Sequence, residues 1–184
     1  MTCAVLFRQC GSDHMTRGRT RKIDHIVEHY TGTVASAKNN AIYFSRNEGQ
    51  GSSAHYFVDD ITDEIYQSVA DGDTAWHAGD WDMNCRSIGI EIVSGGEDFS
   101  DAELEKAAWL TKTLQKKYGI PDSNVIRHFD VTGKLCPAPT LTAGSGRSSR
   151  RGCAGARVAA ALQLVAPAVV LVACPGAPRS WRAA

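Results

Sequence analysis

One stretch of the 184-residue chain, residues 86–121, constrains the fold more than any other. It begins with RSIGIEIV, a β-branched run that is typical of a strand. The helical pattern that follows has marked ends. Ser100 and Glu103 form a capping-box pattern at its start, and Gly119 and Pro121 mark its end. Apolar residues between these ends recur at the spacing of one helix face, so the stretch predicts a strand followed by an amphipathic helix.

Shorter runs on both sides of this stretch predict further strands and one further helix. Residues 23–29, 54–58, 64–69 and 125–127 are rich in β-branched, aromatic or other apolar residues and favour strands. Residues 35–46 contain neither Gly nor Pro, which favours a helix. Strands interleaved with helices indicate an α/β domain with a mixed central β-sheet flanked by helices.

Charge is distributed unevenly along the chain and indicates its organisation. Residues 141–184 contain six Arg and no Asp or Glu, while residues 1–22 contain four Arg and one Lys against Asp13 alone. The intervening body has a formal charge of about −10, which argues against nucleic acid as the main partner. We therefore predict a disordered extension over residues 1–21, one domain over residues 22–140, and an atypical tail over residues 141–184.

Neither end of the chain has the full pattern of a membrane or targeting segment. The start, MTCAVLF, has no preceding basic region and is cut off by Arg8, so no secretory signal is predicted. Residues 158–174 are apolar but are interrupted by Gln163 and Pro167, and they fall short of the roughly 20 residues of a membrane helix. Membrane contact through this run is therefore a minor alternative. The bias of the tail toward residues with GC-rich codons favours an out-of-frame end.

Cysteine use indicates a metal site rather than disulfides. Of six Cys residues, only Cys85 and Cys136 lie in the well-patterned body, which is too few for a disulfide framework. His128 precedes Cys136 by eight residues, and zinc accepts both His nitrogen and Cys sulfur. This spacing alone is weak evidence, because a third protein ligand must come from elsewhere in the chain.

A second metal pattern, His25-Ile-Val-Glu28-His29, matches the H-x-x-E-H signature of a class of zinc metallopeptidases. That chemistry needs a helix, on which residues four apart share one face. The local sequence favours a strand instead, and on a strand Glu28 would point away from His25 and His29. The metallopeptidase is therefore the less favoured reading of this string.

Five motifs occur in a fixed order along residues 22–139. They are His29-Tyr-Thr-Gly-Thr33, Ser53-Ala-His-Tyr-Phe-Val-Asp59, Trp76-His-Ala-Gly79, Ser87-Ile-Gly-Ile-Glu-Ile92 and His128-Phe-Asp-Val-Thr-Gly-Lys-Leu-Cys-Pro137. Together they closely resemble the zinc-dependent N-acetylmuramoyl-L-alanine amidases. This family includes many phage endolysins and is related to the peptidoglycan recognition proteins. The resemblance implies a peptidoglycan-recognition-protein-like amidase fold.

The resemblance also implies a catalytic site. Its zinc ligands map to His29, His128 and Cys136, and its catalytic residues map to Glu91 and Lys134. Zinc with three protein ligands keeps one position open for water. A carboxylate can then move the protons of the reaction, and a cation can stabilise a developing oxyanion.

Further expectations follow from the family. His55, His77 and Trp76 are expected to bind the substrate, which is peptidoglycan rather than nucleic acid. The alternatives are that His77 supports the cleft and that Trp76 packs in the core. The expected reaction is hydrolysis of the amide between N-acetylmuramic acid and L-alanine, by a monomer that is made in the cytoplasm and acts on the cell wall. The alternative is a non-catalytic peptidoglycan-binding module, although such modules typically lack the zinc Cys that Cys136 supplies here. Glu28 departs from the family, in which this position is usually apolar.

Overall fold

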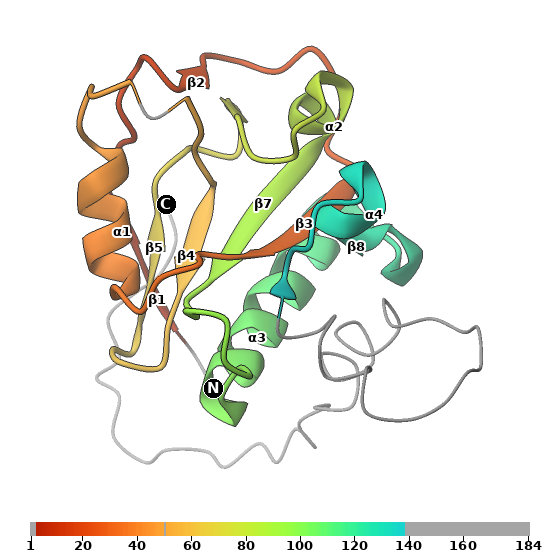
Figure 1. The fold of residues 1–184 in the computed structure, drawn as a ribbon. Helices are drawn as coiled ribbons and strands as arrows, with labels where there is room; N and C mark the ends of the chain where they lie inside the picture. The colour runs from red at the N-terminus through yellow and green to blue at the C-terminus, as the bar shows by residue number, and fades with distance from the viewer. Residues whose placement is uncertain (1–2, 50, 139–184) are drawn as a thin grey trace, which may run out of the picture.

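A mixed β-sheet runs through the centre of the molecule (Figure 1). The structure is a computed structural model that describes residues 3–49 and 51–138. In chain order, the strands are β1 (Ala4–Phe7), β2 (Met15–Thr16), β3 (His25–Tyr30), β4 (Tyr56–Val58), β5 (Glu64–Gln67), β6 (Thr74–Ala75), β7 (Ser87–Ile92) and β8 (Val125–Arg127). Within these residues, the main sheet has the order β1-β5-β4-β7-β3-β8, and β2 pairs with β6 in a small second sheet.

Strand direction explains how the sheet positions the site. β4 and β5 are antiparallel, whereas β7 is parallel to both β3 and β4, and β3 is parallel to β8. The carboxyl ends of β3, β7 and β8 therefore lie at one edge of the sheet. This arrangement confirms the predicted mixed sheet flanked by helices.

The two longer helices cover opposite faces of the sheet (Figure 1). The helices are α1 (Ala37–Phe44), α2 (Trp81–Arg86), α3 (Asp101–Tyr118) and α4 (His128–Thr132), with a 3-10 turn η1 (Asp122–Asn124). Ala107, Leu110 and Leu114 of α3 pack against the isoleucines of β7. On the other face, Ala37 and Ala41 of α1 pack against the β4 residue Phe57.

Helix α3 forms as its sequence predicts. The Ser100 hydroxyl accepts a hydrogen bond from the Glu103 backbone N–H, and the Glu103 carboxylate accepts one from the Ser100 N–H. This reciprocal pair satisfies donors that the first helical turn leaves free. Gly119 ends the helix with a φ of +70°, a conformation that glycine adopts without steric cost.

The H-x-x-E-H string lies on strand β3, as its β-branched residues favoured. Side chains alternate along a strand, so His29 points to the α1 face, while Ile26 and Glu28 point to the α3 face. The structure therefore excludes the helical geometry that a metallopeptidase at His25, Glu28 and His29 would need.

The structure contradicts the predicted disorder of the N-terminal extension. β1 pairs in parallel with β5, and Cys10 and Met15 are buried against Val69 and Ala75. The outer edge of β5 offers free backbone donors and acceptors, which bind a further strand whatever its side-chain pattern. The domain limits at residues 22 and 140 stay predictions.

Two short helices of the structure were not predicted from the sequence. These helices are α2 and α4, and α4 begins at the predicted zinc ligand His128. The predicted tail over residues 141–184, with its apolar run, lies outside the described residues. Among the described helices, none combines the length and the apolar character that a membrane crossing requires.

Candidate metal centre

Three buried side chains meet at the carboxyl edge of the sheet. His29 lies near the end of β3, His128 follows β8 directly, and Cys136 lies beyond α4. One ligand atom from each of the three lies within 4.8 Å of those of the other two. His29 Nδ1 is 3.1 Å from His128 Nδ1 and 3.8 Å from Cys136 Sγ. The structure thus brings together the three residues that were predicted as zinc ligands.

These distances fit a single small cation. Zinc binds His nitrogen at about 2.0–2.1 Å and Cys sulfur at about 2.3 Å, so two ligands of a tetrahedral site lie roughly 3–4 Å apart. Two imidazoles and a thiol are also a donor set that zinc prefers over oxygen-seeking cations. The residues present therefore fit a zinc ion.

The remaining ring nitrogens of both His residues have partners within the protein. The backbone carbonyl of Ala78 accepts a hydrogen bond from the His128 ring, whose Nε2 lies beside Gly79. His29 Nε2 lies 2.9 Å from His77 Nδ1. Metal-binding His residues commonly use their second nitrogen in this way, because the contact fixes the ring orientation.

Electrostatics keep both imidazoles neutral. Burial lowers the pKa of His29 well below its ordinary value, and His77, His128 and Lys134 lower it further. Burial and the positive charge of Lys134 also lower the pKa of His128. Burial raises the pKa of the Cys136 thiol to about 11, and Glu91 adds to this effect. Both His residues are therefore ready to bind a metal at neutral pH, whereas the thiol must first lose its proton.

Glu91 and Lys134 border the three-residue cluster. Glu91 is the β7 partner of His29 in the β3–β7 register. Its Oε2 is buried and has no hydrogen-bond partner within the described part of the chain. Burial raises the pKa of Glu91 to about 8, and the charge of Lys134 opposes this rise. Lys134 itself is solvent-exposed.

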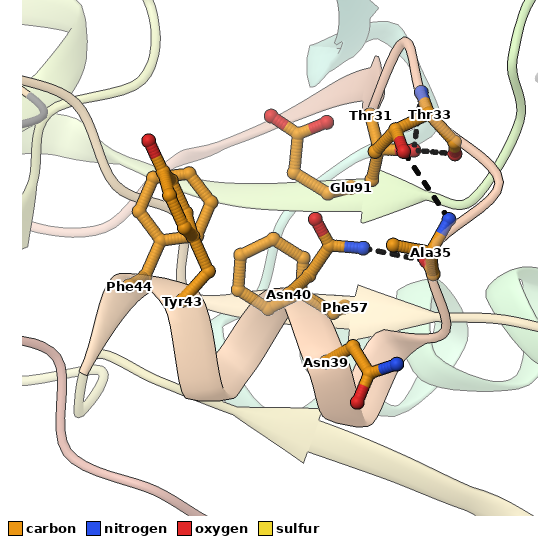
Figure 2. A pocket seen from close by; sticks show the side chains of 9 residues that line it. All are labelled: Thr31, Thr33, Ala35, Asn39, Asn40, Tyr43, Phe44, Phe57 and Glu91. Atoms are coloured by element: carbon orange, nitrogen blue, oxygen red, sulfur yellow. Dashed lines mark hydrogen bonds between the residues drawn. The ribbon is translucent and has the colours of Figure 1, made fainter. Parts of the chain in front are cut away.

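A cavity of about 340 Å³ adjoins this cluster through Glu91. Figure 2 shows Glu91 on the β7 side of the cavity and the α1 side chains on the other. The lining residues are Thr31, Thr33, Ala35, Asn39, Asn40, Tyr43, Phe44, Phe57 and Glu91. Thr31, Thr33 and Phe57 lie in motifs of the sequence, but only Glu91 was assigned a role from it. The α1 residues were not predicted, because a helix pattern does not say which side chains face a cavity.

The structure gives the predicted substrate-binding residues other partners. His55 is fully buried, and its Nδ1 accepts a hydrogen bond from the Gly89 N–H at 3.0 Å. His77 is buried between His29 and Ser87. Trp76 is partly buried, and its Nε1 donates to Thr16 Oγ1 at 3.0 Å. Substrate binding by His55, His77 and Trp76 stays a prediction.

Comparison with known proteins connects this geometry to one family. The profile of the family described as N-acetylmuramoyl-L-alanine amidase matches residues 19–139. The chain is 35% identical over 133 residues to the N-acetylmuramoyl-L-alanine amidase CwlL of Bacillus licheniformis, covering 64% of this chain and 36% of that protein. It is 37% identical over 122 residues to the amidase XlyA of Bacillus subtilis (strain 168), covering 64% of this chain and 40% of that protein.

Solved structures agree with the sequence comparison. The structure of the catalytic domain of XlyA superposes with a TM-score of 0.70 at 29% identity, covering 88% of this chain and 99% of that one. The chain spans less than half the length of the curated relatives that it matches. The similarity therefore lies in a catalytic domain rather than in those proteins as wholes.

Proposed function

Because this chain belongs to the N-acetylmuramoyl-L-alanine amidase family, we propose that it cleaves peptidoglycan. The bond cleaved is the amide between the lactyl group of N-acetylmuramic acid and L-alanine of the stem peptide. The observation that carries the proposal is the position of Glu91 beside the cluster of His29, His128 and Cys136. One carboxylate oxygen of Glu91 is buried and has no hydrogen-bond partner among residues 3–49 and 51–138.

In this proposal, His29, His128 and Cys136 hold one zinc ion. Zinc, when bound, supplies a Lewis acid that polarises a carbonyl oxygen or a water molecule. The two neutral imidazoles can bind without losing a proton, whereas Cys136 binds as the thiolate. The low-lying pKa values of His29 and His128 support this assignment.

Glu91 and Lys134 serve the chemical steps. Water attacks the lactyl carbonyl carbon, and Glu91 accepts the proton that the water loses. When the C–N bond breaks, Glu91 delivers that proton to the leaving amine of L-alanine. Lys134 places a positive charge where the carbonyl oxygen becomes negative, which stabilises the tetrahedral intermediate. Its influence on the pKa values of His29, His128 and Glu91 supports its nearness to this point.

The cavity between α1 and β7 is the proposed binding place for the substrate beside the scissile bond. Amide groups of Asn39 and Asn40 and the rings of Tyr43 and Phe44 line it, and this mixture suits a ligand with peptide bonds and apolar methyl groups. Peptidoglycan is the proposed partner and the cell wall the proposed place of action, with the chain working as a monomer.

Two variants of the full chain test this function. Cys136→Ala should lose both bound zinc and the release of dye from labelled cell walls. Glu91→Ala should keep zinc but lose activity by a factor of about 10²–10⁴, as expected for removal of a general base. Cys85→Ala is a matched control, because Cys85 is equally buried but lies outside the cluster.

The outcomes separate the alternatives. If Cys136→Ala retains both metal and activity, the assignment of the metal site is wrong. If the unmodified chain binds zinc and cell walls but releases no dye, the chain is a non-catalytic binding module.

A further inference from the structure

A buried chain of hydrogen bonds leads away from the metal cluster. His29 Nε2 lies 2.9 Å from His77 Nδ1, and His77 Nε2 lies 3.1 Å from the Ser87 hydroxyl oxygen. Ser87 is fully buried, and its hydroxyl donates to the Met83 carbonyl of α2 at 2.6 Å. The chain thus runs from a backbone carbonyl to a predicted zinc ligand.

The direction of each hydrogen bond in this chain follows from the bond between the Ser87 hydroxyl and the Met83 carbonyl. A carbonyl oxygen carries no proton, so the 2.6 Å contact between Ser87 and Met83 must contain the hydroxyl proton. The Ser87 oxygen can then only accept from His77, which places the proton of His77 on Nε2. A neutral imidazole has one N–H, so His77 Nδ1 is an acceptor and His29 Nε2 must donate to it.

With its proton on Nε2, His29 keeps a free lone pair on Nδ1. This atom is the one that lies 3.1 Å from His128 Nδ1 and 3.8 Å from Cys136 Sγ. In the opposite tautomer, His29 would turn an N–H toward the place where a metal ion has to bind.

We propose that Ser87 and His77 are positioning residues that hold His29 in the tautomer with its proton on Nε2, and so keep Nδ1 free for the metal. The proposal rests on the zinc function proposed above. Ser87 and His77 lie outside the three-residue metal cluster and act on it through His29. Ser87 fixes the proton of His77, and His77 in turn fixes the proton and the ring orientation of His29.

The surroundings of His77 are shaped for this role. A Cβ atom at Gly89 would lie 2.6 Å from His77 Cγ, so the His77 ring occupies space that only glycine leaves on β7. The side chain of Asn84 accepts from the backbone N–H groups of His77 and Ala78 at 3.0 and 2.8 Å. Both the ring and its backbone are therefore held in place.

Local charge also favours a neutral His77. Its ring packs edge-on against His55 at 5.6 Å, and His55 contacts the guanidinium of Arg19. A second proton on His77 would place another positive charge in this buried region, at a cost in desolvation and repulsion.

Alternate residues of the motif Ser87-Ile-Gly-Ile-Glu-Ile92 all serve the metal site in this arrangement. Ser87, Gly89 and Glu91 lie two residues apart on β7 and share the face that carries the site. Ser87 fixes the proton of His77, Gly89 leaves room for its ring, and Glu91 borders the metal cluster.

The direct test is the tautomer of His29 in the metal-free full chain, read from the ring ¹⁵N and ¹³C resonances. The expected result is a proton on Nε2 of His29 and on Nε2 of His77. A proton on Nδ1 of His29 in the unmodified, folded chain would overturn the proposal. This readout needs no activity, so it fails or succeeds separately from the amidase assignment.

Zinc affinity of three variants provides the second test, measured by competition with a chromophoric chelator. Ser87→Ala and His77→Leu should each weaken zinc binding by about 10–100-fold, the usual cost of losing such a partner. His77→Asn should restore much of the affinity, because an Asn oxygen can accept from His29 near the position of His77 Nδ1.

Ser68→Ala is the matched control for Ser87→Ala. Ser68 is also fully buried, and its hydroxyl has no hydrogen-bond partner within the described residues. The control should bind zinc as the unmodified chain does. Zinc affinities of Ser87→Ala and His77→Leu within about twofold of the unmodified chain would overturn the proposal.

Discussion

Replacing Glu28 by Gln should make the protein more stable, by an amount that grows with pH. Glu28 is 2% exposed and points to the α3 face of β3, where its register partner is Ile90. Its Oε1 has no hydrogen-bond partner in the part of the chain that the structure describes. Burial raises the pKa of this carboxyl group from 4.5 to about 8.

The sign and size of the effect follow from that shift. Because the pKa is higher in the folded state, the folded protein keeps a proton that the unfolded chain releases between pH 4.5 and about 8. The corresponding stability is complete below pH 4.5 and is lost as pH rises through 8. At about 1.4 kcal/mol per pKa unit, the loss amounts to roughly 4–5 kcal/mol. Gln has no carboxyl proton to lose, so the Glu28→Gln variant does not undergo this loss of stability.

The assay is urea unfolding of metal-free Glu28→Gln and unmodified protein at pH 5, 7 and 8.5. Other titrating groups cancel in the difference between the two unfolding free energies, which should rise by about 1.4 kcal/mol per pH unit from pH 5 to about pH 8 and then level off. Glu105→Gln is the control, because it makes the same change at an exposed position of α3. A Glu28→Gln difference that is constant from pH 5 to 8.5 would refute the reasoning.

Three further predictions concern α3 and the metal site. Ser100→Ala removes the acceptor for the Glu103 N–H and should lower the free energy of unfolding by about 1 kcal/mol in urea titrations; an unchanged value would show that the cap is energetically silent. Lys134→Gln should keep zinc while slowing wall hydrolysis, and loss of zinc would instead make Lys134 structural. Zinc binding near pH 7.5 should release about one proton, because the Cys136 thiol, with a pKa of about 11, must become a thiolate. Calorimetry in buffers of different ionisation enthalpy measures this release. Release of no proton would contradict the thiolate ligand.

The elements that the sequence predicted well are those with local signals. The capping box at Ser100 and the glycine at 119 mark α3 within a turn, and the β-branched run over residues 86–93 marks β7. The same local signals assigned the string at residues 25–29 to a strand, although its letters match a helical zinc signature. Local backbone preference predicted this segment better than the motif did, because the residues of a motif can bind a metal together only if the backbone places them on one face.

Other features depend on contacts between distant residues and left no local signal. Helices α2 and α4 span only six and five residues, too few to form without the structure around them. β1 forms by pairing with β5, so its order depends on an edge that the sequence does not reveal.

The site shows the same division. The spacing of His128 and Cys136 indicated two ligands, but only the family resemblance supplied His29, which the fold then brings beside them. His77 was expected to bind substrate, and its contacts with His29 and Ser87 appear only in the folded chain, since they join residues 48 and 10 positions apart.

The most direct measurement of the central claim is identification of the bond that the chain cleaves. Purified peptidoglycan would be digested with the zinc-loaded full chain, and the products would be analysed by mass spectrometry. The account predicts free stem peptides that begin with L-alanine and glycan strands whose muramic acid lactyl groups end in carboxylates. It also predicts that a chelator abolishes these products and that added zinc restores them. New reducing sugar ends, cleavage within the stem peptide, or the same products in the presence of the chelator would contradict the account.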